Sequence, residues 1–193
     1  MKREVLLDVD GVLLDWFSRF PYFLKEKGLD HEHAIRMFAN NQFSSLEELT
    51  GLPTEQATEL SIEYQRSKYM KYLSPYKDAL QVVNLLKHKY NFIAVTAVLD
   101  DPLTLQYRTE NLEFWYPGAF SKVHCVGINQ SKFEVLSKYD RTVFVDDSPG
   151  HIIEAKNAGH TPIRLKIDAR PCVTQSLTAG NWHELNNLIQ ILV

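Results

Sequence analysis

The stretch 3–15, with the letters REVLLDVDGVLLD, constrains the fold of this chain more than any other. It begins with an apolar run of strand-forming residues, which is stopped by two aspartates and Gly11. Because side chains alternate along a strand, Asp8 and Asp10 are expected to point to the same side. Two carboxylates in one small space repel each other unless a cation or a shared proton relieves them. The pattern predicts a Mg²⁺ site or a protonated aspartate, both suited to phosphoryl chemistry, and the alternative is a solvated acidic turn.

Downstream of Pro75, short apolar runs alternate with amphipathic segments of helical period. Such alternation predicts a parallel sheet with right-handed crossovers and helices on both faces. We therefore expect an α/β fold, a Rossmann-like doubly wound parallel sheet. Strands are expected at 92–96, 122–126, 142–145 and 161–165, and helices at 78–89, 102–113, 131–139, 149–158 and 181–191.

Residues 15–74 show no strand alternation and are expected to form a helical insertion after the first strand. Asp15 is a candidate cap for the first helix, and Gly28 is placed to end it. Ser44 and Glu47 have the spacing of a capping box, and a longer helix is expected from Thr54 to about Leu73. The core would then comprise residues 1–14 and 75–193.

Polar side chains stand at the ends of the predicted strands. Thr96 ends the string FIAVT and is followed by Ala97, while Asp146 and Asp147 end VFVDD. Lys132 opens the predicted helix between those two strands. The carboxyl ends of parallel strands meet at one edge of a sheet, where ligands bind. Each residue alone is an ordinary strand-end hydroxyl, lysine or turn acid, but their fixed order favours one shared site.

In this order, DVDGV, the threonine of FIAVT, the helix-opening lysine and VFVDD resemble the motifs of the haloacid dehalogenase (HAD) superfamily of aspartate-nucleophile phosphatases. The resemblance covers about residues 3–15 and 75–165. It implies that Asp8 attacks phosphorus to form an aspartyl phosphate, and that Asp10 acts as general acid and then as general base. It further implies a Mg²⁺ cofactor held by Asp8, the backbone carbonyl of Asp10, and Asp146.

The same resemblance assigns the remaining site residues. Thr96 and Lys132, with backbone N–H groups around Gly11 and Ala97, would bind the transferring phosphoryl group. Asp147 would anchor Lys132 or a metal-bound water. The insertion 15–74 lies where this superfamily carries a helical cap subdomain, which excludes water and selects a small substrate.

The extended first motif DVDGVLLDWF and the short helical cap look most like the 5′(3′)-deoxyribonucleotidase branch of the superfamily. That likeness implies a small phosphorylated metabolite as substrate, a nucleoside monophosphate held by aromatic side chains of the cap. The candidates are Trp16, Phe17, Phe20 and Phe43, although packing inside the cap is the other expectation for most of them. Ala97 departs from the serine usual in that branch, so one phosphate contact is missing or comes from the backbone.

Two other kinds of protein fit the same residues. A HAD phosphatase or phosphotransferase for another small metabolite, such as a sugar phosphate, would use the same two aspartates of the first motif. A non-catalytic binding module on this fold would typically lack one of the acids. Arg108 is expected on the surface or between helices, with contact to the substrate as a further alternative. The role of His151, just beyond the last motif, is left open.

The composition limits the kinds of molecule that this protein is expected to bind. With 193 residues, a net charge of −3 and 45% hydrophobic residues, the chain suits one globular domain and has no basic footprint for extended nucleic acid or a membrane surface. Cys125 and Cys172 are too few and too distant for a disulfide framework, which suits a reducing compartment. The start of the sequence lacks the pattern of a signal peptide, so a cytoplasmic location is expected.

Overall fold

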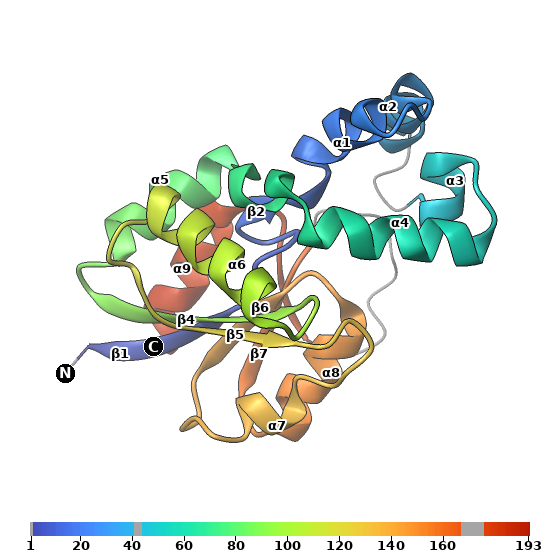
Figure 1. Cartoon of the computed structure of the whole chain (residues 1–193). Helices are drawn as coiled ribbons and strands as arrows, with labels where there is room; N and C mark the ends of the chain where they lie inside the picture. The colour runs from blue at the N-terminus through green and yellow to red at the C-terminus, as the bar shows by residue number, and fades with distance from the viewer. Residues whose placement is uncertain (1, 41–43, 167–175) are drawn as a thin grey trace.

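The structure, a computed structural model, describes residues 2–40, 44–166 and 176–193, and in this part of the chain a six-stranded parallel sheet forms the centre (Figure 1). The strand order is β5-β4-β1-β6-β7-β8, and every neighbouring pair is parallel. The strands are β1 (Arg3–Leu7), β4 (Tyr90–Ala97), β5 (Phe120–Val126), β6 (Val143–Asp146), β7 (Thr161–Leu165) and β8 (Leu177–Ala179). The predicted α/β class is confirmed, and the short edge strand β8 was not foreseen.

Helices cover both faces of the sheet. Those of the core are α5 (Lys77–Leu86), α6 (Pro102–Trp115), α7 (Phe133–Leu136), α8 (Pro149–Asn157) and α9 (Trp182–Leu192). In Figure 1, α5, α6 and α9 lie on one side of the strands, and α7 and α8 lie on the other. None of the described helices is both long and apolar enough to span a bilayer.

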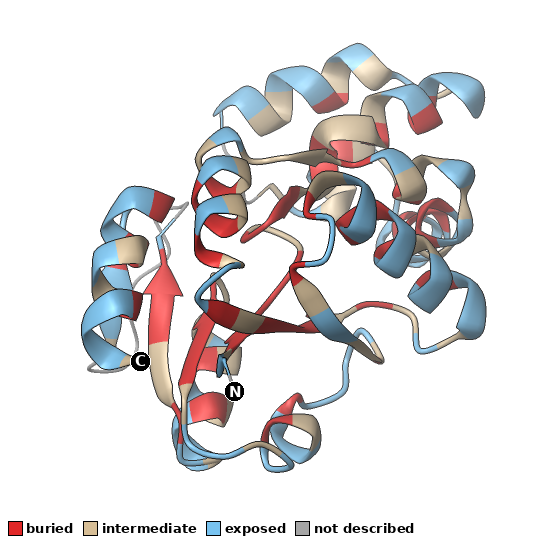
Figure 2. Ribbon diagram, turned by 90° about the vertical axis from the view of Figure 1, so that its left-hand side faces the viewer, coloured by how far each residue is buried: buried red, intermediate tan, exposed pale blue. Residues whose placement is uncertain are grey.

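The residues of β1 show how this layering follows from strand alternation. Val5 and Leu7 pack into the core shared with α5, α6 and α9, whereas Leu6 packs into a second cluster with Leu136 of α7 and Ala155 of α8. The central strands β1, β4 and β6 are largely buried between the helical layers, whereas the edge strands β5 and β8 are more exposed (Figure 2). A strand enclosed on both faces has a continuous apolar sequence, as the first motif has.

The pairing register brings the carboxyl ends of the central strands together. Leu7 of β1 pairs with Ala94 of β4 on one side and with Val145 of β6 on the other. The residues that follow these positions therefore emerge at one edge of the sheet. The chain segments after β1, β4 and β6 meet there.

A helical cap is inserted after β1, as predicted. Its elements are η1 (Trp16–Arg19), α1 (Phe20–Glu26), α2 (His31–Asn40), α3 (Leu46–Thr50), α4 (Thr54–Arg66) and η2 (Lys68–Tyr72). In Figure 1, α1, α2 and α3 extend away from the sheet, and α4 leads back toward it. Where the chain leaves and re-enters the core, β2 (Leu14–Asp15) and β3 (Ser74–Pro75) form a two-stranded antiparallel pair that was not predicted.

Three local predictions for the cap can be compared with the structure. Asp15 does cap the first helical turn, accepting from the N–H of Phe17 at 3.0 Å. The capping box is formed by Ser45 and Glu48 and not by Ser44 and Glu47; the two bonds measure 3.2 and 2.7 Å. Ser44 instead donates to the carbonyl of Met37 in α2, and the next serine caps α3.

The single helix predicted from Thr54 to Leu73 is interrupted at Ser67. The backbone of Ser67 is extended, with ψ of 159°, and the chain resumes as the 3-10 helix η2. Ser67 also donates through its hydroxyl to the carbonyl of Tyr64, which closes the end of α4. A side chain that bonds the preceding turn competes with helix continuation, and spacing alone did not reveal this.

Candidate active site

The chain turns sharply where β1 ends. The carbonyl of Val9 accepts from the N–H groups of Leu13 and Leu14 at 2.8 and 2.9 Å, and Gly11 has φ of 79°. This left-handed conformation favours glycine, which has no Cβ to clash with the following carbonyl. The backbone pairing with β6 continues to Asp8, whose N–H donates to the carbonyl of Val145 at 2.8 Å, and the turn follows. Asp8 and Asp10 flank Val9 at this strand end, and their carboxylates have different hydrogen-bond partners.

Lys132 is bound by two buried carboxylates. Its Nζ donates to Oδ1 of Asp8 and to Oδ2 of Asp146, each at 2.7 Å. The side chain of Lys132 is fully buried, and Asp8 and Asp146 are 8% and 0% exposed. Lys132 precedes the short helix α7, and its backbone N–H is held by Oε2 of Glu154 at 2.8 Å. The predicted meeting of the first motif, the lysine and the last motif thus occurs in the fold.

Burial shifts the pKa values of the charged residues in this cluster. The pKa of Asp8 is raised to about 7, first by burial and then by the charges of Asp146 and Asp147, although Lys132 opposes the shift. Burial disfavours the charged form of Lys132, but its two carboxylate partners outweigh this and raise its pKa. Burial also acts to raise the pKa of Asp146, yet Lys132 and His151 overcome it, and the net shift is downward. The lysine cation therefore stabilises the anionic cluster.

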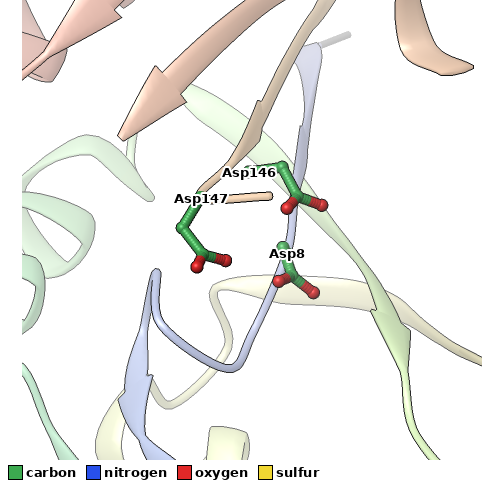
Figure 3. A group of neighbouring side chains, drawn as sticks. All are labelled: Asp8, Asp146 and Asp147. Carbon is green, nitrogen blue, oxygen red and sulfur yellow. The ribbon is translucent and has the colours of Figure 1, made fainter. Parts of the chain in front are cut away.

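Asp147 completes a set of three carboxylates. Asp8, Asp146 and Asp147 each offer an oxygen, and these atoms lie within 4.8 Å of one another. Figure 3 shows their side chains gathered at the ends of β1 and β6. The carboxyl group of Asp147 lies against Gly11, where an added Cβ would be 2.9 Å from its Cγ. Oxygen donors converging in this way fit Mg²⁺, with Asp147 in the carboxylate set where only a supporting role was predicted.

Asp10 lies outside this set and pairs with an arginine. Nη2 of Arg108 donates to Oδ2 of Asp10 at 2.5 Å. Burial raises the pKa of Asp10, while the charge of Arg108 acts in the opposite direction. Arg108 is fully buried, so its predicted place on the surface is wrong. The signal available was helical spacing, because Thr104, Arg108 and Leu112 fall on one face of α6 and all three are buried.

Thr96 and Ala97 are the last residues of β4, at the same edge. The side chain of Thr96 is fully buried, and its Oγ1 has no hydrogen-bond partner among the described residues. A buried hydroxyl without a partner is unusual in a folded protein, which is consistent with a ligand contact. Gly11, Thr96, Ala97 and Lys132 come from the ends of different core segments, as their predicted role in phosphate binding requires.

Two residues beyond the predicted set support the last motif. Nδ1 of His151, in the first turn of α8, lies 3.1 Å from Oδ2 of Asp146. The contact with Asp146 raises the pKa of His151 against the effect of burial. Arg164 of β7 is fully buried and donates through Nε to the carbonyl of Asp147 at 3.1 Å. These contacts orient the two aspartates of the motif. The sequence did not predict them, because His151 and Arg164 belong to other elements, α8 and β7.

The aromatic residues proposed to hold the substrate lie mainly inside the cap. Phe20 is fully buried, with ring centroids of Trp16 and Tyr64 at 4.9 and 5.1 Å. Phe17 is 7% exposed and stacks on Phe38 at 3.9 Å. The rings of Phe17 and Phe20 therefore belong to the packing of the cap, the other expectation for them. Trp16 is partly exposed, and the candidate Phe43 lies outside the described residues.

Comparison of this sequence with those of known proteins identifies its family. No family profile matches this sequence. An uncharacterised 32.4 kDa protein from the gp30–rIII intergenic region of enterobacteria phage T4 is 40% identical over 195 residues, an alignment that covers 97% of this chain and 69% of the phage protein. This chain belongs to the family of that phage protein. Their shared identity runs through nearly the whole chain, so the core and the cap are both family features.

Solved structures with low sequence identity show the HAD fold. The magnesium-bound HAD-hydrolase YfnB of Bacillus subtilis superposes with a TM-score of 0.68 at 14% identity, covering 97% of this chain and 98% of that one. The HAD-like protein SP0104 of Streptococcus pneumoniae gives 0.64 at 14% identity and covers 97% and 98%. L-2-haloacid dehalogenase of Xanthobacter autotrophicus gives 0.63 at 14% identity and covers 98% and 99%. The HAD fold includes both the parallel sheet and the inserted helical cap.

Proposed function

We propose that this protein is a Mg²⁺-dependent phosphomonoesterase that works through an aspartyl phosphate. The observation that carries the proposal is the buried Lys132, whose Nζ lies 2.7 Å from both Asp8 and Asp146. A cation held this way opposes the rise in the pKa of Asp8 that burial causes, and it fixes the carboxylate at a strand end, as a nucleophile requires. The magnesium in the YfnB structure supports the choice of metal.

The reaction divides into two displacements at phosphorus. An oxygen of the Asp8 carboxylate attacks phosphorus while the bond to the ester oxygen breaks, and Asp10 gives its proton to that leaving oxygen. Asp10 then takes a proton from the water that attacks the aspartyl phosphate, which releases inorganic phosphate and restores Asp8. The raised pKa of Asp10 suits a proton donor. Lys132 and the Thr96 hydroxyl neutralise and bind the phosphoryl oxygens.

The metal site would use the carboxylates of Asp8, Asp146 and Asp147, together with the backbone carbonyl of Asp10 as the HAD resemblance implies. A bound Mg²⁺ polarises the phosphoryl group and offsets the repulsion among the acids and the substrate. The same converging acids favour phosphate chemistry over displacement of a halide. A halide leaves without a proton and needs no divalent cation, so Asp10 as proton donor, and Asp146 and Asp147 gathered beside Asp8 as metal ligands, would have no part in it.

We further propose that the substrate is a small phosphorylated metabolite and, more specifically, a nucleoside monophosphate. The inserted cap supports a small substrate, because α4 ends next to the segment that follows β4, where Oε1 of Gln65 accepts from the N–H of Leu99 at 3.0 Å. Within the described part of the cap, the partly exposed Trp16 is the remaining candidate for contact with a base.

Phosphate release tests the proposal. Purified protein is incubated with nucleoside 5′- and 3′-monophosphates, sugar phosphates and phosphoserine, with Mg²⁺ or with EDTA, and a haloacid is tested for halide release. We expect Mg²⁺-dependent phosphate release that Asp8→Asn abolishes without unfolding the protein, and strongest release from nucleotides. Turnover of another phosphate would keep the phosphatase and reject the nucleotide, whereas halide release or full activity of Asp8→Asn would reject the mechanism.

A further inference from the structure

Arg108 lies in the middle of α6 and is fully buried. Helix α6 packs against β5 of the core and against α4 and η2 of the cap. The guanidinium group therefore lies where core and cap meet, and its contact with Asp10 places it at the proposed active site. An arginine buried at this place is costly unless its charge and its donors are used.

Within the described part of the chain, one of the three guanidinium nitrogens of Arg108 forms a hydrogen bond. Nη2 donates to Asp10, but Nε and Nη1 are buried and have no acceptor among the described residues. Arginine carries N–H donors on all three nitrogens and cannot accept a hydrogen bond. Buried donors without partners are rare in native structures because they have lost their water without replacement. The unused donors point to an oxygen that arrives with a ligand.

Asp10 shows on which side that ligand would bind. Its Oδ2 is engaged by Arg108, while its Oδ1 is buried and has no partner in the described part of the chain. If Oδ1 of Asp10 exchanges a proton with the leaving oxygen, then Arg108 is bonded to Oδ2 of the same carboxyl group, next to the leaving oxygen. The unused donors of Arg108 are therefore near the alcohol portion of the substrate. The phosphoryl group itself would be bound by Lys132 and Thr96.

The chemistry of a guanidinium group limits what it would bind. Its planar, permanently charged fork matches the paired oxygens of a carboxylate or a phosphate, and charge-assisted bonds of this kind are stronger than neutral ones. A neutral hydroxyl would use one of the free donors and leave the charge unmatched. An anionic group on the alcohol portion would use both donors and charge.

We propose that Arg108 is a specificity-determining residue that binds a second anionic group, a carboxylate or a phosphate, on the leaving alcohol of the substrate. This inference rests on the proposed function, since it takes Asp10 as the residue beside the leaving oxygen. It narrows the small phosphorylated metabolites proposed above to phosphomonoesters whose alcohol carries a negative charge close to the ester oxygen. The leaving alcohol of a nucleoside monophosphate is neutral, so this inference competes with the nucleotide assignment, and the two make opposite predictions for charged and neutral alcohols.

The test compares three phosphate esters of similar size. Phospholactate carries a carboxylate next to the ester carbon, propanediol bisphosphate carries a second phosphate there, and sec-butyl phosphate carries neither. The quantity measured is the ratio of kcat/KM for each anionic ester to kcat/KM for sec-butyl phosphate. We expect Arg108→Met to lower that ratio by about 10- to 100-fold, the value of a charge-assisted hydrogen bond. Arg108→Lys, which keeps the charge and loses the fork, should lower it less.

This ratio of kcat/KM values distinguishes two roles of Arg108, binding of an anionic group on the substrate and positioning of Asp10. If Arg108 only orients Asp10, all three esters lose rate equally and the ratio stays constant, which would overturn the inference. Arg66→Met is the matched control, because Arg66 is an exposed arginine at the end of α4 that pairs with Asp101, the N-cap of α6, at 3.4 Å. We expect this control to keep the wild-type ratio. A fall in ratio for the carboxylate alone, or for the second phosphate alone, would identify which anion is bound.

The two proposals fail in different ways. Absence of Asp8-dependent phosphate release from every ester would reject the phosphatase. Calorimetric binding of the same esters to wild type, Arg108→Met and Arg108→Lys would still decide the role of Arg108. Tighter binding of the anionic esters that is lost in the folded variants supports the inference, and equal affinity for charged and neutral esters in wild type overturns it.

Discussion

Nζ of Lys132 lies 2.7 Å from Oδ1 of Asp8, although 124 positions separate the two residues in the chain. The same nitrogen lies 2.7 Å from Oδ2 of Asp146. One buried cation is therefore shared by two carboxylates from the ends of neighbouring strands. Removing the lysine would leave two buried carboxylates without their cation, so stability and activity both depend on Lys132.

Lys132→Met should destabilise the protein strongly. The substitution leaves Asp8 and Asp146 as buried acids without their cation, and removing one partner of a buried pair costs about 3–5 kcal/mol. Urea unfolding at mildly alkaline pH, without metal, measures the loss. Lys68→Met serves as control, because Lys68 pairs with Glu26 on the surface and should change stability little. Equal losses in the two variants would contradict the structural role of the buried cation.

Gly11→Ala should damage the site beyond its cost in backbone strain. Gly11 has φ of 79°, and a Cβ there would lie 2.9 Å from Cγ of Asp147. Gly28 has a similar φ of 73° but open space around it, so Gly28→Ala measures the strain alone, about 1–2 kcal/mol. We expect Gly11→Ala to lose more stability and to weaken Mg²⁺ binding, followed by calorimetry. Unchanged Mg²⁺ affinity would show that Asp147 is not displaced.

Thr96→Val should reduce activity without reducing stability. The Oγ1 of Thr96 is buried and has no partner in the described part of the chain, so folding loses no hydrogen bond. If this hydroxyl binds a phosphoryl oxygen, its loss should lower kcat/KM by about 10²-fold, as for a single oxyanion donor. Thr142→Val is the counterpart, because its hydroxyl donates to the carbonyl of Glu4 far from the site. That variant should lose about 1 kcal/mol and keep its activity.

Mg²⁺ should stabilise the protein more as pH rises. The pKa of Asp8 is raised to about 7 in the metal-free fold, chiefly by burial and then by Asp146, against an ordinary value of 3.8. Between these values the folded state binds more protons than the unfolded state, so this group lowers stability as pH rises toward 7. The metal needs the ionised carboxylate, and its binding competes with the proton.

The measurement is the rise in Tm produced by saturating Mg²⁺ between about pH 5.5 and about pH 8. We expect the rise to grow through the range in wild type. Asp8→Asn, which has no proton to release there, should show a smaller rise with a flatter profile. A constant rise in wild type would mean that Asp8 does not titrate in this range or does not bind the metal.

The helices and strands were predictable wherever the signal was local. The apolar run before Asp8 and the alternation after Pro75 reflect burial on two faces, and the confirmed sheet follows from them. Errors arose where near-equivalent residues compete for one position. Ser45 caps α3 in place of Ser44, and Ser44 donates to the carbonyl of Met37 in α2.

The role of Arg108 could not be predicted with the same confidence as that of Lys132. Lys132 belongs to an ordered set of motifs, whereas Arg108 lies in a helix whose sequence has many polar residues and no clear apolar face. Its pairing with Asp10 joins residues 98 positions apart and depends on how α6 rests between the sheet and the cap. Helical spacing could place Arg108 on the same face as Leu112 but could not supply the partner.

By itself, the sequence determined which side chains arrive at the carboxyl edge of the sheet, because strand and helix periods are set by short-range burial and apolar runs mark the strand ends. Only the tertiary structure decided how those side chains pair. Around the turn at Gly11, Asp8 pairs with Lys132, which also binds Asp146, and Asp10 pairs with Arg108. Those pairings follow from the turn and from packing between elements distant in the chain, which no local pattern encodes.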